Sequence, residues 1–440
     1  MIKLTTQQLA QILNANLIGD EQVVVENINT DTRKSVSNSL FFALKGEHFD
    51  AHQYLDKAVE QGATALVVQQ ANTEIATPQL VVADTRLALG QLAKWLREKI
   101  NPRTVAMTGS SGKTTVKEMT ASILQQTAGN PEAVLFTNGN FNNDIGVPLT
   151  LLRLTEQHKF AVIELGANHQ GEIDYTTHLA QPEAALVNNV AAAHLEGFGS
   201  IEGVARAKGE IYRGLTQNGV AIINNEHNYI ELWQKEIGSH AIQYFNGGDY
   251  KAENVKHSPN GSMFTLVSPK GSIEINLPYL GEHNVKNALA ATALAMNVGA
   301  SLADVKVGLE HRSQVKGRLF PIQVHDNLLL LDDTYNANVD SLQAAIDVLK
   351  SYDAFRILLV GDMKELGEDS LKCHQQVGEH AKQAKLDLVL SYGTESAVIS
   401  EAVLGKHFTD KAELTDYALD IIKQKLQENQ KVVVLAKGSR

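Results

Sequence analysis

The stretch RTVAMTGSSGKTTVKEMTASILQQT, residues 103–127, decides the fold of this chain. It contains a short apolar strand, a turn of glycine and serine, and then a helix. A loop in this context binds phosphate, because the backbone N–H groups at the start of the helix all point at the ligand. The usual pattern G-x-x-x-x-G-K-[ST] is shortened here to G-S-S-G-K-T, since Met107 occupies the place of the leading glycine.

Each part of the loop has a predicted contact with a nucleotide. Backbone N–H groups would face phosphate oxygens at the positive end of the helix, Lys113 would neutralise the β- and γ-phosphates, and the Thr114 hydroxyl would bind magnesium. The loop residues predicted to contact ATP are Gly109, Ser110, Ser111, Gly112, Lys113, Thr114 and Thr115. The alternative is a glycine–serine turn that merely precedes a lysine, and the flanking strand and helix argue against it.

Apolar strands continue beyond the loop, at 160–168, 184–190 and 220–225, with helical stretches between them. This alternation predicts a parallel α/β sheet. Residues 250–280 alternate between apolar and polar side chains and are interrupted by glycines, which predicts a small antiparallel addition. A long alanine-rich helix is expected at 284–299.

Three α/β domains are predicted from these segments. Residues 1–84 mix short helices and strands and form a small domain, residues 85–315 form the central phosphate-loop domain, and residues 316–440 form a Rossmann-like domain. The last strand ends at KGSR, where a strand–helix unit should continue into a helix. The C-terminal domain is therefore expected to be truncated at its end.

Composition excludes several classes of protein. Acidic residues outnumber basic ones by 50 to 39 in 440 residues, and the net charge of −11 argues against a nucleic-acid-binding surface. The single cysteine, Cys373, rules out an internal disulfide and a thiolate metal cage. No signal peptide is visible, and no apolar run approaches the roughly 20 residues that span a bilayer. A cytoplasmic enzyme without membrane insertion is expected.

Polar residues at strand ends are candidates for the site. Glu164 lies at the carboxyl end of a strand, where parallel sheets bind ligands, and could hold magnesium beside the phosphates. His194 follows the next strand, although a lone histidine is more often structural, and Lys208 would ordinarily be a solvated helix lysine. Asn284 and Asn287 share one helix face, and Asn284 could equally be an N-cap.

The start of the third domain supplies further candidates. Arg318 follows Gly317, and Asp333 ends the run LLLLDD, which continues into TYNAN. Asp333 is again a carboxylate at the carboxyl end of a strand. Ordinary surface chemistry is the alternative for each of these residues.

Together these residues resemble the Mur ligase family, the ATP-dependent amide-forming ligases of peptidoglycan precursor synthesis. The family uses the short loop G-x-x-G-K-[ST], and the resemblance covers the whole chain. The positions that match those shared by the family are Lys113, Glu164, His194, Asn284, Asn287, Arg318 and Asp333. Lys208 matches the lysine that many members carry as a carbamate bridging magnesium.

Within the family, the chain is similar to the branch that adds D-alanyl-D-alanine to UDP-N-acetylmuramoyl-tripeptide. The stretches that carry this likeness are 30–68, 137–154, 332–346 and 361–367. A sister branch, which adds diaminopimelate or lysine, often bears an Asn-Pro-Arg motif in its last domain, and residues 316–440 of this chain contain none. A second alternative is a nucleotide-gated binding protein that hydrolyses ATP without forming amides.

The resemblance implies a monomer that uses ATP and two magnesium ions and carries a carbamate on Lys208. The implied catalytic residues are Lys113, His194, Lys208, Arg318 and Asp333. The implied metal ligands are Thr114, Glu164, His194 and Lys208. Further nucleotide contacts are expected from Asn284, Asn287, Arg318, Asp333, Tyr335, Asn336 and Asn338. Thr32 and Arg33 are expected to bind the UDP end of the substrate, and Asn140 its peptide.

Overall fold

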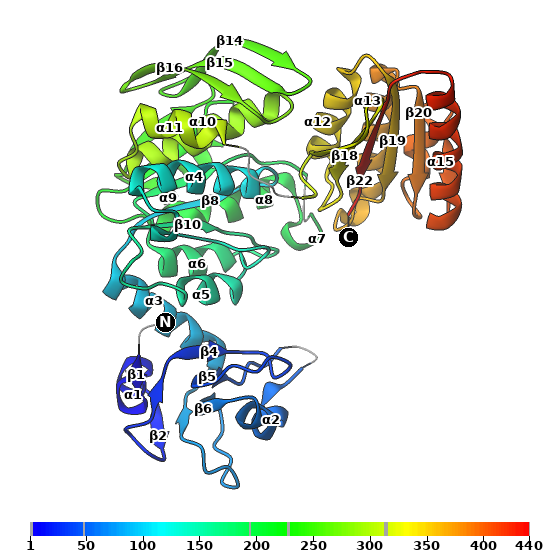
Figure 1. Ribbon diagram of the computed structural model, residues 1–440. Coiled ribbons are helices and arrows are strands. Elements are labelled where there is room, and N and C mark those ends of the chain that lie inside the picture. Colours follow the sequence, from blue (N-terminus) through cyan, green and yellow to red (C-terminus); the bar gives the residue numbers. More distant parts are fainter. Residues whose placement is uncertain (1–2, 47–48, 193–194, 227–228, 312–315, 440) are drawn as a thin grey trace.

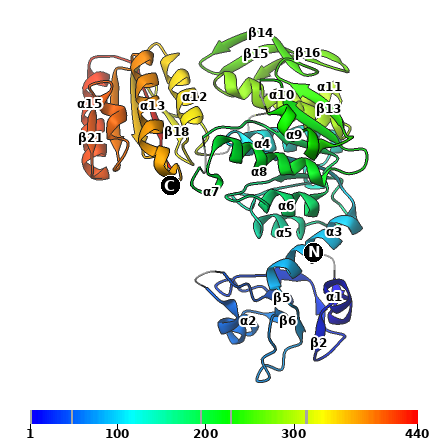
Figure 2. The same cartoon turned by 180° about the vertical axis from the view of Figure 1, so that it is seen from behind.

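The computed structural model describes residues 3–46, 49–192, 195–226, 229–311 and 316–439. It has three α/β domains in chain order, and the central domain contacts both of the others (Figure 1). Seen from behind, the C-terminal domain again lies beside the upper part of the central domain (Figure 2). Within the described residues, no helix is long and apolar enough to cross a membrane.

The N-terminal domain is built on a mixed sheet with strand order β2-β7-β6-β5-β4, in which β2 runs antiparallel to its neighbour. Its elements are β1 (Leu4–Thr5), α1 (Thr6–Leu13), β2 (Asn16–Ile18), β3 (Val24–Val25), β4 (Asn27–Asn29), β5 (Ser39–Phe42), the 3₁₀ helix Ala51–Tyr54, α2 (Leu55–Glu60), β6 (Ala63–Val68) and β7 (Gln79–Val81). The 3₁₀ helix is capped by Asp50, whose side chain accepts from His52 N at 3.0 Å, and it continues directly into α2.

The central domain contains a parallel sheet with strand order β13-β12-β11-β8-β10-β9, as predicted. Its strands are β8 (Arg103–Thr108), β9 (Val134–Phe136), β10 (Phe160–Glu164), β11 (Ala184–Val187), β12 (Val220–Asn224) and β13 (Ala241–Phe245). Both faces are covered, so successive side chains of β8 enter opposite cores: Ala106 packs in one, Val105 and Met107 in the other. Because β8 is buried on both faces, the residues before the phosphate loop form a continuous apolar run and not an alternating one.

Helices cover both faces of that sheet. The helices of the domain are α3 (Thr85–Ile100), α4 (Lys113–Ala128), the 3₁₀ helix Pro131–Ala133, α5 (Gly146–Leu151), α6 (Glu172–Ala180), α7 (Leu195–Phe198), α8 (Ile201–Gly209), the 3₁₀ helix Glu210–Gly214, α9 (Ile230–Ile237), α10 (Glu282–Asn297) and α11 (Leu302–Glu310), of which α11 packs on α4 and β16. The predicted antiparallel addition is confirmed as the sheet β14 (Lys251–Ser258), β15 (Gly261–Ser268) and β16 (Gly271–Leu277). The predicted boundary near residue 84 falls between β7 and α3, and that at 315 lies outside the described residues.

The C-terminal domain has the strand order β17-β18-β22-β19-β20-β21, parallel except for β17. Its elements are β17 (Phe320–His325), β18 (Leu328–Asp333), α12 (Val339–Lys350), β19 (Phe355–Gly361), the 3₁₀ helix Gly367–Asp369, α13 (Ser370–Ala384), β20 (Leu388–Tyr392), α14 (Ala397–Glu401), β21 (Lys406–Phe408), α15 (Lys411–Gln427) and β22 (Val432–Lys437). The carboxyl ends of β18 and β22 lie side by side, with Asp333 in register with Lys437.

Gly308 sets how closely α11 approaches α4. A Cβ atom at this position would lie 2.5 Å from the Ile123 Cα atom, and a backbone atom cannot rotate away. We expect Gly308→Ala to destabilise the protein by about 1–2 kcal/mol, because overpacking outweighs the better helix propensity of alanine. Thermal unfolding measures this loss, and Val307→Ala on the exposed face of α11 is the control. Equal midpoints for both variants would contradict the close-packing argument.

Candidate active site

The phosphate loop joins β8 to α4 and needs glycine at two places. Gly109 has φ +154° and Gly112 has φ +75°, backbone conformations that other residues rarely adopt. A Cβ atom on Gly112 would also lie 2.6 Å from Asn188 Nδ2 and 2.6 Å from Asn287 Oδ1. Gly112 is therefore required both for the backbone turn and for the space that two asparagine side chains occupy.

Asn188 and Asn189, at the carboxyl end of β11, hold the loop from one side. Ser111 N donates to Asn189 Oδ1 at 2.8 Å, and Asn188 Nδ2 donates to the Ser111 carbonyl oxygen at 3.1 Å. Ser110 N donates to the Asn189 carbonyl oxygen at 3.1 Å. Sequence reasoning missed both asparagines, although a pair of amides directly after an apolar strand was the available signal.

The predicted pair Asn284 and Asn287, on α10, extends this hydrogen-bond network beyond Asn188. Asn287 Oδ1 accepts from Asn188 Nδ2 at 3.0 Å, and Asn287 Nδ2 donates to Asn284 Oδ1 at 3.0 Å. Asn284 Nδ2 donates to the Leu280 carbonyl oxygen at 2.8 Å. The N-cap alternative for Asn284 is wrong, because Gly281 occupies the cap and Asn284 lies within the first turn of α10.

The central and C-terminal domains meet at the phosphate loop. Arg318 Nη2 donates to Thr114 Oγ1 at 3.2 Å, and its guanidinium lies 4.1 Å from the ring centroid of Tyr335. Asn338 caps α12 through Ser341 and donates from Nδ2 to the Ser110 carbonyl oxygen at 3.3 Å. The structure thus brings together residues that the sequence places in two domains.

Lys113 starts α4, and its Nζ donates to the Gly109 carbonyl oxygen at 2.6 Å. Desolvation lowers the pKa of Lys113, and Arg318 lowers it further, while Glu164 acts in the opposite direction. A bound phosphate would stabilise the charged form of Lys113, because its negative charge would offset the cost of desolvating the ammonium group.

Glu164 is nearly fully buried, with 2% of its surface exposed, and lines a cavity beside the loop. Its Oε1 accepts from Asn142 Nδ2 at 2.8 Å, whereas the buried Oε2 has no hydrogen-bond partner among the described residues. A buried carboxylate oxygen without a donor is costly unless a cation binds it. The residues present therefore fit a divalent cation that has oxygen ligands.

Lys208, near the end of α8, lines the same cavity and is 2% exposed. Burial, together with the charge of Lys113, lowers the pKa of Lys208 well below its usual range. A lowered pKa increases the fraction of neutral amine, which is the form that reacts with CO₂. His194, the other predicted ligand, lies outside the described residues. Among the described residues, no three His, Cys, Asp or Glu side chains cluster as a metal site.

Two cavities adjoin the loop and share Ser111, Gly112, Arg318 and Ser341. The first, about 340 Å³, lies between α10 and the C-terminal domain; the predicted residues lining it are Ser111, Gly112, Thr115, Asn284, Asn287, Arg318 and Asp333. The second, about 190 Å³, lies on the Glu164 and Lys208 side of the loop and is called the reaction cavity. Its predicted lining residues are Ser110, Ser111, Gly112, Lys113, Asn140, Glu164, Lys208, Arg318, Tyr335, Asn336 and Asn338.

Asp333 forms a buried ion pair with Lys437, a residue that the sequence analysis did not select. The carboxylate accepts from Leu319 N at 3.1 Å and forms an ion pair with Lys437 Nζ at 2.7 Å. Lys437 is 4% exposed and also donates to the Asn336 carbonyl oxygen at 2.9 Å. This buried pair fixes the loop after β18, which carries Tyr335 and Asn338 to the reaction cavity.

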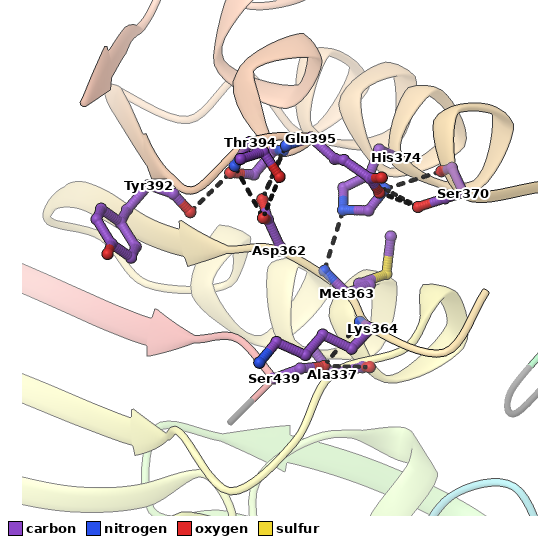
Figure 3. A network of polar contacts seen from close by, with 11 residues as sticks. Ala337, Asp362, Met363, Lys364, Ser370, His374, Tyr392, Thr394, Glu395 and Ser439 are labelled. Atoms are coloured by element: carbon purple, nitrogen blue, oxygen red, sulfur yellow. Dashed lines mark hydrogen bonds and ion pairs between the residues drawn. The ribbon is translucent and has the colours of Figure 1, made fainter. Parts of the chain in front are cut away.

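A polar network joins the loops at the carboxyl ends of β19 and β20 (Figure 3). The Asp362 carboxylate accepts from the backbone N–H groups of Thr394, Glu395 and Ser396, which holds its pKa at about 2. Ser439 Oγ bonds to Asn336 Oδ1 at 3.0 Å. The loops therefore form one continuous edge that reaches the residues of the reaction cavity.

Two predicted substrate residues lie elsewhere. Thr32 and Arg33 are in the N-terminal domain and line neither cavity. Arg33 is exposed and pairs with Asp31 through Nε at 2.8 Å, which lowers the pKa of Asp31 to about 2.

Models of known families match most of the chain. The model described as Mur ligase family, catalytic domain, matches residues 24–96; the Mur ligase middle domain matches residues 107–295; and the Mur ligase, glutamate ligase domain, matches residues 317–440. The chain belongs to the Mur ligase family. Its short phosphate loop is thus the form of the motif expected for a Mur ligase.

Individual relatives place the chain in the MurF branch. A UDP-N-acetylmuramoyl-tripeptide–D-alanyl-D-alanine ligase from Haemophilus influenzae is 78% identical over 440 residues, all of this chain and 96% of that protein. A MurF crystal structure from Acinetobacter baumannii has a TM-score of 0.95 at 41% identity, covering 100% of this chain and 96% of the other. MurF from Thermotoga maritima in complex with ADP has a TM-score of 0.82 at 26% identity, with 94% of each chain covered.

The asparagine contacts at Gly112 predict a sharp difference between two glycine substitutions in this Mur ligase. Gly112→Ala and Gly129→Ala both place a side chain at positive φ, at the two ends of α4, but the space around Gly129 is open. Both should lose about 1 kcal/mol of stability. We expect only Gly112→Ala to weaken ADP binding, by at least about tenfold, because it displaces Asn188 or Asn287 from the loop. Calorimetric titration measures this, and parental affinity in Gly112→Ala would contradict it.

Proposed function

We propose that this chain is an ATP-dependent ligase that joins D-alanyl-D-alanine to UDP-N-acetylmuramoyl-tripeptide in cytoplasmic peptidoglycan precursor synthesis. The observation that carries the proposal is the reaction cavity, where the phosphate loop, a buried carboxylate and a buried lysine face residues of the C-terminal domain. The relative that is 78% identical bears the name of this reaction. The Thermotoga maritima structure is a complex with ADP, which supports nucleotide binding by this chain.

The reaction needs activation because a carboxylate oxygen is a poor leaving group. The tripeptide carboxylate oxygen attacks the γ-phosphorus of ATP, the bond to the β-phosphate oxygen breaks, and an acyl phosphate and ADP result. The dipeptide amine then attacks the acyl carbon, inorganic phosphate leaves with the bonding electrons, and the amine loses a proton. An amide, ADP and phosphate are the products.

The side chains of the cavity serve the first step by bringing two anions together. Lys113 and Arg318 supply positive charge, and that charge counts for more in a partly desolvated site than in water. Arg318 is held in place by Tyr335 and Thr114, so it needs little reorganisation. Asn284, Asn287 and the Asp333–Lys437 pair would line the nucleoside side, and Asn140 would meet the peptide.

Two magnesium ions are part of the proposal. Thr114 and Glu164 would hold one, and His194 with a carbamate on Lys208 the other. Bound magnesium would neutralise phosphate charge and orient the γ-phosphoryl group. The partnerless Glu164 Oε2 supports the first site, and the lowered pKa of the buried Lys208 supports carbamate formation. We further propose that Thr32 and Arg33 bind the UDP end and that the enzyme acts as a monomer.

A measurement of phosphate release distinguishes the proposed ligase from the sister ligase and from the nucleotide-gated binding ATPase. With Mg-ATP and UDP-tripeptide, we expect release to depend on D-alanyl-D-alanine and to equal the amide formed; L-alanyl-L-alanine is the control. Release that ignores the dipeptide would favour a nucleotide-gated binding ATPase. Amide formation from UDP-dipeptide with diaminopimelate or lysine would favour the sister ligase.

Substitution of Lys208 tests the carbamate. Lys208→Ala should lose about 10²–10³ in turnover, as for loss of one transition-state stabiliser. Added formate or acetate should restore part of the activity by supplying the missing carboxylate. The control is Arg206→Ala, an exposed residue of the same helix, which should keep parental turnover. No rescue, together with no carbamate carbon signal in the ¹³C NMR spectrum of the folded, active protein in ¹³C-labelled bicarbonate, would contradict the carbamate.

A further inference from the structure

Lys117 is a buried cation that the proposed reaction does not use. It lies one helical turn after Lys113 in α4, and only 2% of its surface is exposed. Burying an ammonium group is unfavourable unless acceptors surround it. A methionine or leucine would fill the same space without that cost, so the contacts of the ammonium need an explanation.

Those contacts join α4 to the segment after β9. Lys117 Nζ donates to the Thr137 carbonyl oxygen at 2.8 Å, and it lies 5.6 Å from the ring centroid of Phe136. Its charged partner is Glu118 Oε1, at 2.7 Å. The ammonium group therefore lies between α4 and the start of the loop formed by residues 137–142.

That loop is also tied to the candidate metal ligand. Thr137 Oγ1 accepts from Glu164 N at 3.0 Å, and Asn142 Nδ2 donates to Glu164 Oε1 at 2.8 Å. Asn140 and Asn142 both line the reaction cavity. A movement of Thr137 would therefore displace Glu164 and the asparagines together.

We propose that Lys117 is a positioning residue that couples the phosphate-loop helix to the loop 137–142. Nucleotide bound at the start of α4 fixes Lys117, and Lys117 fixes the side of the reaction cavity that meets the tripeptide. The coupling follows from the contacts within the chain; its effect on the tripeptide rests on the proposed function.

Hydrogen exchange of the unsubstituted enzyme is the first test. Mg-ADP should slow exchange of the amides in residues 137–142. Lys117→Met should abolish this protection while its affinity for ADP stays parental, and Lys117→Gln, which keeps a neutral donor, should retain part of it. If ADP leaves exchange of this loop unchanged in the unsubstituted enzyme, the coupling is refuted, whatever the variants do and whether or not the enzyme forms amides.

Steady-state kinetics is the second test. Lys117→Met should raise KM for UDP-tripeptide by about ten- to a hundredfold, the value of a charged hydrogen bond, with KM for ATP little changed. Ser122→Ala is the matched control: Ser122 is also buried in α4 and donates to a carbonyl oxygen, that of Gly308 at 2.8 Å, on the side of α11. It should lose stability but keep both KM values. A parental KM in Lys117→Met, or an equal rise in Ser122→Ala, would overturn the positioning role.

Discussion

The contact between Asn188 and the phosphate loop is the constraint on which the site depends. The Asn188 amide donates to the Ser111 carbonyl oxygen and to Asn287 Oδ1, across a gap that is open because Gly112 has no side chain. The first bond occupies the Ser111 carbonyl oxygen, and the amides at the start of α4, which have no partner within the helix, are suited to bind phosphate. The same bonds connect β11, the loop and α10, so the shape of the loop depends on the packing of the central domain.

Positive charge is concentrated in a chain that is acidic overall. The net charge is −11, yet Lys113, Lys208, Arg318 and Lys437 line the two adjoining cavities. Burial lowers the pKa of Lys113, Lys208 and Lys437, because desolvation disfavours their charged forms. Anionic substrates reverse that balance, because they supply the counter-charges that desolvated cations need. In the reaction cavity Lys113 and Arg318 face one carboxylate, Glu164, so positive charge there favours the binding of phosphates.

The meeting of two domains at this cavity has a consequence for motion. Arg318 reaches Thr114, and Asn338 reaches the Ser110 carbonyl, so the C-terminal domain contacts both ends of the phosphate loop. Both contacts are made to residues predicted to bind the phosphates of ATP. A bound nucleotide would therefore bias how the domains sit, by adding its own contacts to both of them.

The sequence by itself determined the phosphate loop, the parallel central sheet and the antiparallel addition. These features are local, since a strand, a glycine turn and a helix each have a pattern that can be read over a few residues. Glu164 and Asp333 could be selected for the same reason, as carboxylates at strand ends. The resemblance to a family extended this to Lys208, whose burial no local pattern reveals.

Only the tertiary structure decided which side chains meet. Arg318 and Thr114 are 204 residues apart in the chain, and Asn188 and Asn287 are 99 apart. Asn188, Asn189, Lys117 and Lys437 were missed because asparagine and lysine are ordinary surface residues in any local window. Their roles arise from burial, since an amide or ammonium removed from water must find its partners wherever the fold places them.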